Sequence, residues 1–151
     1  MIDRSKYSLL IFDCDEEYLF RTKIFLEQKG YAVFTSSTFE EFMAQLNERP
    51  FDLVFFNWDF SDVTSEKIEG LVAVKNSIPH LAVIITTVSN QWPDLKHVTF
   101  DNLEYLRKPF PIWELFLRVS NIFRCMELRN KLEGTLYELS TLKESTSRKI
   151  T

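Results

Sequence analysis

The chain has 151 residues, which is the length of one ordinary domain. Hydrophobic residues make up 45% and charged residues 26%, a composition that predicts a buried core and excludes a disordered or collagen-like chain. The net charge of −4 disfavours binding to nucleic acid, because phosphate contacts need clustered Lys and Arg. No apolar run approaches the roughly 20 residues that span a bilayer, so we expect no membrane partner either.

The two cysteines, Cys14 and Cys125, lie far apart in the sequence and belong to no CxxC pair or Cys/His cluster. Neither a disulfide framework nor a zinc site is therefore indicated, and a reducing cytoplasm is the expected compartment. The first residues also lead directly into an apolar strand pattern, without the longer apolar stretch of a signal peptide.

Five short apolar runs alternate with longer helical patterns along the chain. Strands are predicted at 7–12, 31–35, 51–57, 81–87 and 103–106, and helices at 16–29, 38–48, 64–77, about 90–98 and from about 111 onward. Nearly continuous apolar runs are typical of strands that are buried on both faces of a parallel sheet. The strict alternation predicts a five-stranded, doubly wound α/β fold with helices on both faces of the sheet.

Residues that begin or end helices support these limits. Gly30 follows the first helix in the position of a C-terminal cap, and Ser37–Glu41 has the pattern of a capping box at the start of the second. Pro50 and Pro79 are expected to end the second and third helices.

Polar side chains follow four of the predicted strands, at the edge where doubly wound sheets bind their ligands. These residues are Asp13, Cys14 and Asp15, then Asn57 and Asp59, then Thr86 and Thr87, and finally Lys108. Carboxylates, an amide, a hydroxyl and an ammonium group are thus expected to converge on one place. Such a set suits a phosphoryl group and a divalent cation, provided that the carboxylates are complete.

Four segments in this order, LLIFDCD, FDLVFFNWDFSD, VIITTV and EYLRKPF, resemble the receiver domain of bacterial response regulators over roughly residues 5–124. The resemblance implies a flavodoxin-like receiver fold whose pocket contains an acidic cluster, a phosphoacceptor Asp, a hydroxyl and a Lys. It implies that Thr87 is the hydroxyl that follows the phosphoryl group and that a cis peptide bond precedes Pro109. It also implies that Tyr105 is the aromatic switch residue.

The pocket departs from this family at two positions. The phosphoacceptor position is Asn57, and a neutral carboxamide is a poor nucleophile that cannot form an acyl phosphate. The second acid, a magnesium ligand in the family, is replaced by Cys14. The metal site is therefore weakened twice, because a thiol and the Asn57 amide stand where hard carboxylate oxygens are needed. We expect no metal or other cofactor, with Asp13 and Asp15 as weak Mg²⁺ candidates. Lys108 is expected to pair with Asp13 or to donate to the Asn57 oxygen, which locks the site in one state without phosphate.

Several of these residues also have plainer interpretations. Asp15 is placed to be the N-cap of the first helix, and Asn57 to be a hydrogen-bonded remnant of the acceptor. Cys14 is either a small buried hydrophobe or, next to Lys108, a thiol with a lowered pKa that senses oxidation.

Two alternative functions keep phosphoryl chemistry. Asp59 is a second candidate acceptor, although a shift of two residues along the chain moves the carboxylate by several Å from an in-line position. The segment IFDCDEEYL also resembles the start of haloacid-dehalogenase-type phosphatases, with Asp13 as nucleophile and Asp15 as acid/base. Those enzymes need a further acidic pair after the Lys, and here the later acids, beginning with Glu114, belong to the final helix.

The sequence continues beyond the length of a receiver, so we predict a receiver-like domain at 1–124 and a helical extension at 125–151. In the extension, a 4-3-4-3 spacing resembles a short coiled-coil seam that needs a partner helix. The seam consists of Leu128, Leu132, Thr135, Leu139 and Leu142.

We therefore expect a non-enzymatic, degenerate receiver that signals by contact with a protein partner or output domain and by homodimerisation. The contact surfaces are the extended helix and the face formed by the predicted helix at 90–98, the strand at 103–106 and the final helix. Tyr105 and Trp113 are the candidate anchors on this face.

Overall fold

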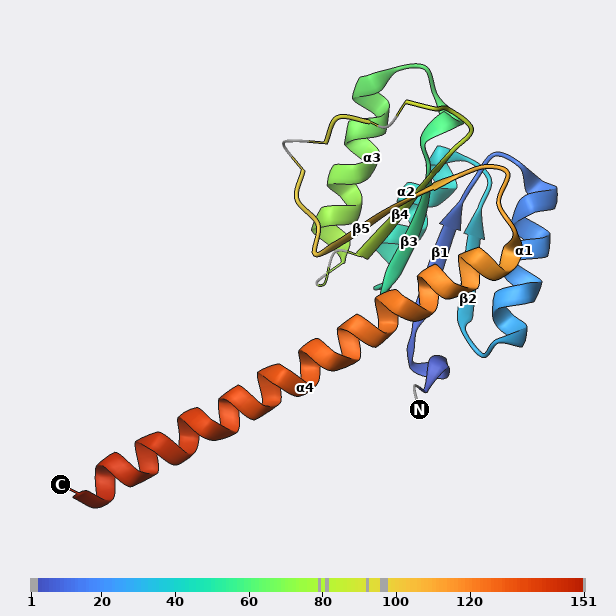
Figure 1. Cartoon of the computed structure of the whole chain (residues 1–151). Coiled ribbons are helices and arrows are strands. Elements are labelled where there is room, and N and C mark those ends of the chain that lie inside the picture. Colours follow the sequence, from blue (N-terminus) through green and yellow to red (C-terminus); the bar gives the residue numbers. More distant parts are fainter. Residues whose placement is uncertain (1–2, 79, 81, 92, 96–97, 151) are drawn as a thin grey trace. The chain divides into compact units, whose positions relative to one another are not determined.

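The computed structural model describes residues 3–78, 80, 82–91, 93–95 and 98–150, without the side chains of 147–150. Its centre is a five-stranded parallel sheet with the order β2-β1-β3-β4-β5 (Figure 1). The strands are β1 (Ser8–Phe12), β2 (Ala32–Ser36), β3 (Leu53–Asn57), β4 (Ala82–Thr87) and β5 (Asn102–Arg107). The helices are α1 (Glu16–Gln28), α2 (Phe39–Glu48), α3 (Thr64–Ser77) and α4 (Ile112–Ile150), with two short 3-10 helices, η1 (Arg4–Lys6) and η2 (Trp58–Phe60).

The predicted five-stranded, doubly wound α/β fold is confirmed. Each strand begins and ends within two residues of its predicted limits. The helices α1 to α4 also begin within two residues of their predicted starts. The register pairs Phe12 with Phe56 and Asn57 with Thr86, so the carboxyl ends of β1, β3 and β4 are nearly level. This alignment brings the polar residues that follow these strands to one edge of the sheet.

Side chains alternate between the two faces of the sheet, and both sets are buried. On the face that α2 and α3 cover, the Phe12 ring stacks on Phe42 at a centroid distance of 4.9 Å and meets Phe56 edge-on at 5.6 Å. On the opposite face, α1 contributes the buried Leu19 and Leu26. The many Phe residues thus form a packed aromatic core beneath α2 and α3.

The helix limits follow from the capping residues that the sequence predicts. Gly30 has φ of 104° after α1, and the N–H of Tyr31 donates to the Leu26 carbonyl at 3.2 Å, as in a Schellman motif. The Thr38 hydroxyl accepts from the N–H of Glu41 at 3.2 Å at the start of α2. Pro50 follows the end of α2, as expected, whereas Pro79 lies outside the described residues.

The helix predicted at about 90–98 is not present in its described part, since residues 90, 91, 93–95 and 98 are not helical. Pro93 lacks the N–H that a helix interior needs. The Ser89 hydroxyl also accepts from the N–H of Gln91 at 3.0 Å, a local hydrogen bond that competes with helix formation. Of the elements expected to form the interaction face, β5 and α4 are each present, and the face itself stays a prediction.

The chain divides into two compact units, Asp3–Phe116, which holds the sheet, and a second that includes Leu117–Thr151. In the second unit, exposed leucines follow the buried Met126. The functional boundary expected between residues 124 and 125 stays a prediction. Within the described ranges, no helix has both the length and the apolarity that crossing a membrane requires.

Candidate functional site

The centre of the site is an ion pair between Asp13 and Lys108. Asp13 follows β1, and its side chain is only 2% exposed. Its Oδ2 accepts from Lys108 Nζ, and its Oδ1 accepts from the N–H of Asp15 at 2.9 Å. Because both charges are largely withdrawn from water, neither is well accommodated without the other. Of the two partners expected for Lys108, the structure thus selects Asp13.

The backbone around Lys108 fixes the position of its ammonium group. The N–H of Lys108 donates to the Thr87 carbonyl at 2.8 Å, which ties the end of β5 to the end of β4. The bond between Lys108 and Pro109 is cis, as the family resemblance implies.

The ring of Tyr18, on α1, packs against the ammonium group of Lys108. The ammonium nitrogen lies 4.0 Å from the centroid of the Tyr18 ring, in the geometry of a cation–π contact. Burial, assisted by the nearby Asp13 carboxylate, raises the pKa of the Tyr18 hydroxyl well above its ordinary value. Tyr18 is not among the site residues predicted from the sequence, because no motif marks the third position after Asp15.

Asn57, at the phosphoacceptor position, caps the turn that follows β3. Its side chain is buried, and its Oδ1 accepts from the N–H of Asp59 at 3.0 Å, which makes it the N-cap of η2. The plainer interpretation of Asn57 as a hydrogen-bonded residue agrees with this contact. The carboxamide oxygen is therefore already engaged in a local structural role.

Asp59 is hydrogen bonded to the carboxyl end of β4. Its Oδ1 accepts from the Thr87 hydroxyl at 2.6 Å, and its Oδ2 accepts from the N–H of Val88 at 2.8 Å. The Thr87 side chain is fully buried, and its oxygen also accepts from the N–H of Ser89 at 3.1 Å. The Asp59 carboxylate thus accepts hydrogen bonds from both the hydroxyl and the N–H at this edge of the sheet.

These contacts leave a poor set of ligands for Mg²⁺. Both oxygens of Asp13 are engaged, and Asp15 caps α1 by accepting from the N–H of Tyr18 at 3.1 Å. Cys14 and Asn57 supply a thiol and an amide where hard carboxylate oxygens are needed. The arrangement therefore does not fit a magnesium site, and weak binding at Asp13 and Asp15 stays a prediction.

Cys14 is exposed, so its interpretation as a small buried hydrophobe is wrong. The interpretation of Cys14 as a thiol with a lowered pKa is also wrong. Partial burial and, next, the Asp13 carboxylate raise the pKa of this thiol, and the opposing effect of Lys108 is smaller.

The two candidate anchors have different surroundings. Tyr105 on β5 is partly buried and packs against the aromatic core, and burial raises the pKa of its hydroxyl. Trp113, in the first turn of α4, is 61% exposed. An exposed Trp side chain is available to a partner, whereas Tyr105 presents only part of its ring.

Comparison with solved structures identifies the fold. A receiver domain protein (CheY-like) from Methanospirillum hungatei JF-1 is 26% identical over 82% of this chain and 98% of its own, with a TM-score of 0.67. A two-component response regulator from Clostridium difficile is 26% identical over 80% of this chain and 98% of its own, with a TM-score of 0.62. The Francisella response regulator 1452 receiver domain is 22% identical over 80% of this chain and 98% of its own, with a TM-score of 0.65.

No family model matches this sequence, and no curated protein matches it. The structural matches, together with the parallel sheet and its strand order, define the flavodoxin-like receiver fold. The expectation of a receiver fold with a long C-terminal helix is therefore confirmed.

Proposed function

We propose that this protein is a degenerate receiver domain of two-component signalling, which acts by protein contact and not by phosphorylation of an Asp. The observation that carries the proposal is the Asp59 carboxylate, which accepts from the Thr87 hydroxyl and the Val88 N–H. The resemblance to receivers makes this hydroxyl the group that follows the phosphoryl group. An internal carboxylate therefore takes the place that a phosphoryl oxygen has in a phosphorylated receiver.

The acceptor position supports the same conclusion. Attack on a phosphodonor needs a carboxylate oxygen, and the Asn57 carboxamide is neutral and already accepts from the Asp59 N–H. Asp59 is a poor substitute acceptor, because both of its oxygens accept hydrogen bonds at 2.6 and 2.8 Å. The pocket is thus held in one state by its own side chains.

The phosphatase alternative has weaker support. Its nucleophile would be Asp13, whose two oxygens are engaged by Lys108 and by the Asp15 N–H. Its acid/base would be Asp15, which caps α1. We therefore propose a signalling domain that is not an enzyme. We also propose that it works in the cytoplasm, because Cys14 and Cys125 are free thiols and a reducing compartment keeps them so.

Contact with a partner protein or output domain, and homodimerisation, complete the proposal. The leucines of the expected seam are between 57% and 64% exposed, at Leu128, Leu132, Leu139 and Leu142. Regularly spaced leucines of this exposure on a helix are typical of a surface that a second helix covers. Trp113 provides a further exposed anchor.

The proposal is tested by intact mass measurement after incubation with acetyl phosphate and Mg²⁺. We expect no phosphoryl adduct on the natural chain. Asn57→Asp, with and without Asp59→Asn, tests whether the missing carboxylate alone silences the site.

An adduct on the natural protein would contradict the proposal. Loss of that adduct in Asp59→Asn would then assign the alternative acceptor, and loss in Asp13→Asn would assign the phosphatase nucleophile.

A further inference from the structure

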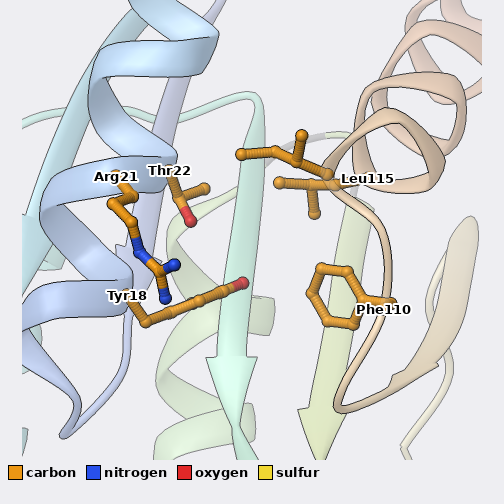
Figure 2. Close-up of a pocket in the computed structure, with 6 residues that line it drawn as sticks. Tyr18, Arg21, Thr22, Phe110 and Leu115 are labelled. Carbon is orange, nitrogen blue, oxygen red and sulfur yellow. The ribbon is translucent and has the colours of Figure 1, made fainter.

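A cavity of about 260 Å³ lies between α1 and the chain that enters α4, within the unit Asp3–Phe116. Side chains of α1 line one side, and the apolar side chains of Phe110 and of the first residues of α4 line the other (Figure 2). The lining residues are Tyr18, Arg21, Thr22, Phe110, Ile112 and Leu115. A second hollow of about 230 Å³ shares Tyr18, Arg21 and Phe110 with the first and adds Asp15, Lys108 and Pro109. None of the roles proposed above uses the first cavity.

The hydroxyl of Tyr18 is the polar group that the cavity leaves without an ordinary hydrogen bond. Its oxygen is buried and makes no hydrogen bond of ordinary geometry among the described residues. Burial, the larger effect, raises the pKa of the hydroxyl, whereas the Thr22 side chain, a hydrogen-bonding neighbour on the next turn of α1, lowers it. Figure 2 shows this hydroxyl directed into the space in front of Phe110. A buried hydroxyl without a partner is costly, and a ligand that supplies an acceptor removes that cost.

A cation also lines this cavity. The Arg21 guanidinium comes from the next turn of α1 and makes a 4.0 Å ion pair with Glu17, where both side chains are mainly exposed. Such an exposed pair is weak, so the guanidinium remains able to bind an anion. Arg also offers two parallel N–H donors, the geometry that a carboxylate accepts.

The opposite wall is apolar. Leu115 is fully buried, and the Phe110 ring meets Tyr18 edge-on at a centroid distance of 6.2 Å. A volume of about 260 Å³ is below the roughly 300 to 1,000 Å³ of pockets for drug-sized ligands, so the occupant is smaller than these.

We propose that this cavity binds a small organic carboxylate with an aromatic or short aliphatic tail. The carboxylate accepts from Arg21 and from the Tyr18 hydroxyl, and the tail packs against Phe110 and Leu115. This goes beyond the proposed function, because it does not depend on whether the strand-end site is phosphorylated.

The same Tyr18 side chain connects the cavity with the strand-end site. Its ring lies 4.0 Å from Lys108 Nζ, and Lys108 pairs with Asp13. A ligand on the Tyr18 hydroxyl therefore contacts a residue that packs directly beneath the ion pair. Binding in the cavity is expected to perturb the backbone resonances of Asp13 and Lys108 as well as those of α1.

The test is a titration of the full chain followed by ¹H–¹⁵N correlation spectra. The probes are 3-phenylpropionate and octanoate, with 3-phenylpropionamide as the neutral match and inorganic phosphate as an anion without a tail. We expect saturable shifts around Tyr18 and Leu115 with both carboxylates. We expect affinity at least about tenfold lower for the amide and for phosphate, since each lacks one of the two recognised groups.

Two variants test the polar contacts, with a control on the same helix. Arg21→Gln is expected to weaken binding about tenfold, and Tyr18→Phe about threefold to tenfold, through loss of one charge or one hydroxyl. Lys23→Gln removes a positive charge from α1 at a residue that does not line this cavity, and it is expected to leave affinity within about twofold. Arg21 is exposed, so its variant reports on binding even if Tyr18→Phe disturbs folding.

Three results would overturn the inference. The first is the absence of saturable shifts with either carboxylate up to about 10 mM, which corresponds to negligible affinity. The second is equal binding of the amide or of phosphate. The third is an equal loss of affinity in Lys23→Gln and Arg21→Gln, which would show that the carboxylates respond to the net charge of α1 and not to Arg21 in the cavity.

Discussion

The Thr87 hydroxyl donates a 2.6 Å hydrogen bond to Oδ1 of Asp59, a residue 28 positions earlier in the chain. The other oxygen of Asp59 accepts from the backbone N–H of Val88 at 2.8 Å. Two donors at the end of β4 thus hold one carboxylate of the turn that follows β3. One side chain therefore accepts both hydrogen bonds at this edge of the sheet.

Replacement of Asp59 tests the importance of these hydrogen bonds for stability. Asp59→Ala leaves the fully buried Thr87 hydroxyl and the Val88 N–H without their acceptor, and the free energy of unfolding is expected to fall by about 1–3 kcal/mol. Asp59→Asn retains one acceptor oxygen and is expected to lose less. Urea denaturation with an unchanged m-value measures both. Equal stability of Asp59→Ala and the natural protein would argue against their importance.

The Asp13–Lys108 pair is tested by a double-mutant cycle. Lys108→Met leaves the 2% exposed Asp13 carboxylate uncompensated, so we expect a loss of about 3 kcal/mol. Adding Asp13→Asn removes the buried charge, and the double variant is expected to regain more than half of this loss. Additive losses in the cycle would mean that the two charges do not depend on one another.

The sequence predicted those parts of the fold and site that rest on local pattern. Continuous apolar runs located all five strands, and Gly30 and Pro50 fixed helix ends because their effects are local. The expectation that Lys108 pairs with Asp13 also agreed with the structure, since both residues follow strands whose carboxyl ends meet at one edge.

Other features depended on tertiary geometry or on competing local interactions. The contact of Asp59 with Thr87 needs the 3-10 turn η2, which apolar periodicity does not reveal. The position of Tyr18 beneath Lys108 depends on how α1 packs, and nothing in the motif marks it. The helix expected at 90–98 is wrong in its described part, because Pro93 lacks the N–H that a helix interior needs and periodicity does not reveal this.

Two glycines of helices provide a matched pair for testing the packing of the aromatic core. A Cβ on Gly70 of α3 would lie 2.6 Å from Cε2 of the buried Phe56, so Gly70→Ala is expected to destabilise the protein by about 1–2 kcal/mol, despite the higher helix propensity of Ala. A Cβ on Gly134 would meet no described atom within 4 Å apart from the adjacent backbone of its own helix. Gly134→Ala is therefore expected to stabilise α4 by up to about 1 kcal/mol. Thermal and urea unfolding of both variants measure the contrast, and a stabilising Gly70→Ala would contradict the close packing.

Tyr18 makes stability depend on alkaline pH. Its pKa is raised in the folded state above the ordinary value of 10.0, so its contribution is fully present below pH 10.0 and is lost as the pH rises beyond it. The free energy of unfolding is expected to fall above this pH by up to about 1.4 kcal/mol per pH unit from this group. Tyr18→Phe should reduce that slope, and Tyr137→Phe, at a ring that is 75% exposed, is the control. The same slope in both variants would exclude Tyr18 as its source.

The extended helix is expected to hold two copies of the chain together through the seam that includes Leu132 and Leu139. Replacing both with Asp places charge in the seam, so the full chain is expected to change from dimer to monomer in light scattering at about 100 µM. Asn130→Asp with Ser140→Asp adds the same charge outside the seam and is expected to leave the dimer intact. A natural chain that is already a monomer at this concentration would contradict dimerisation, and equal dissociation by both double variants would assign the effect to charge alone.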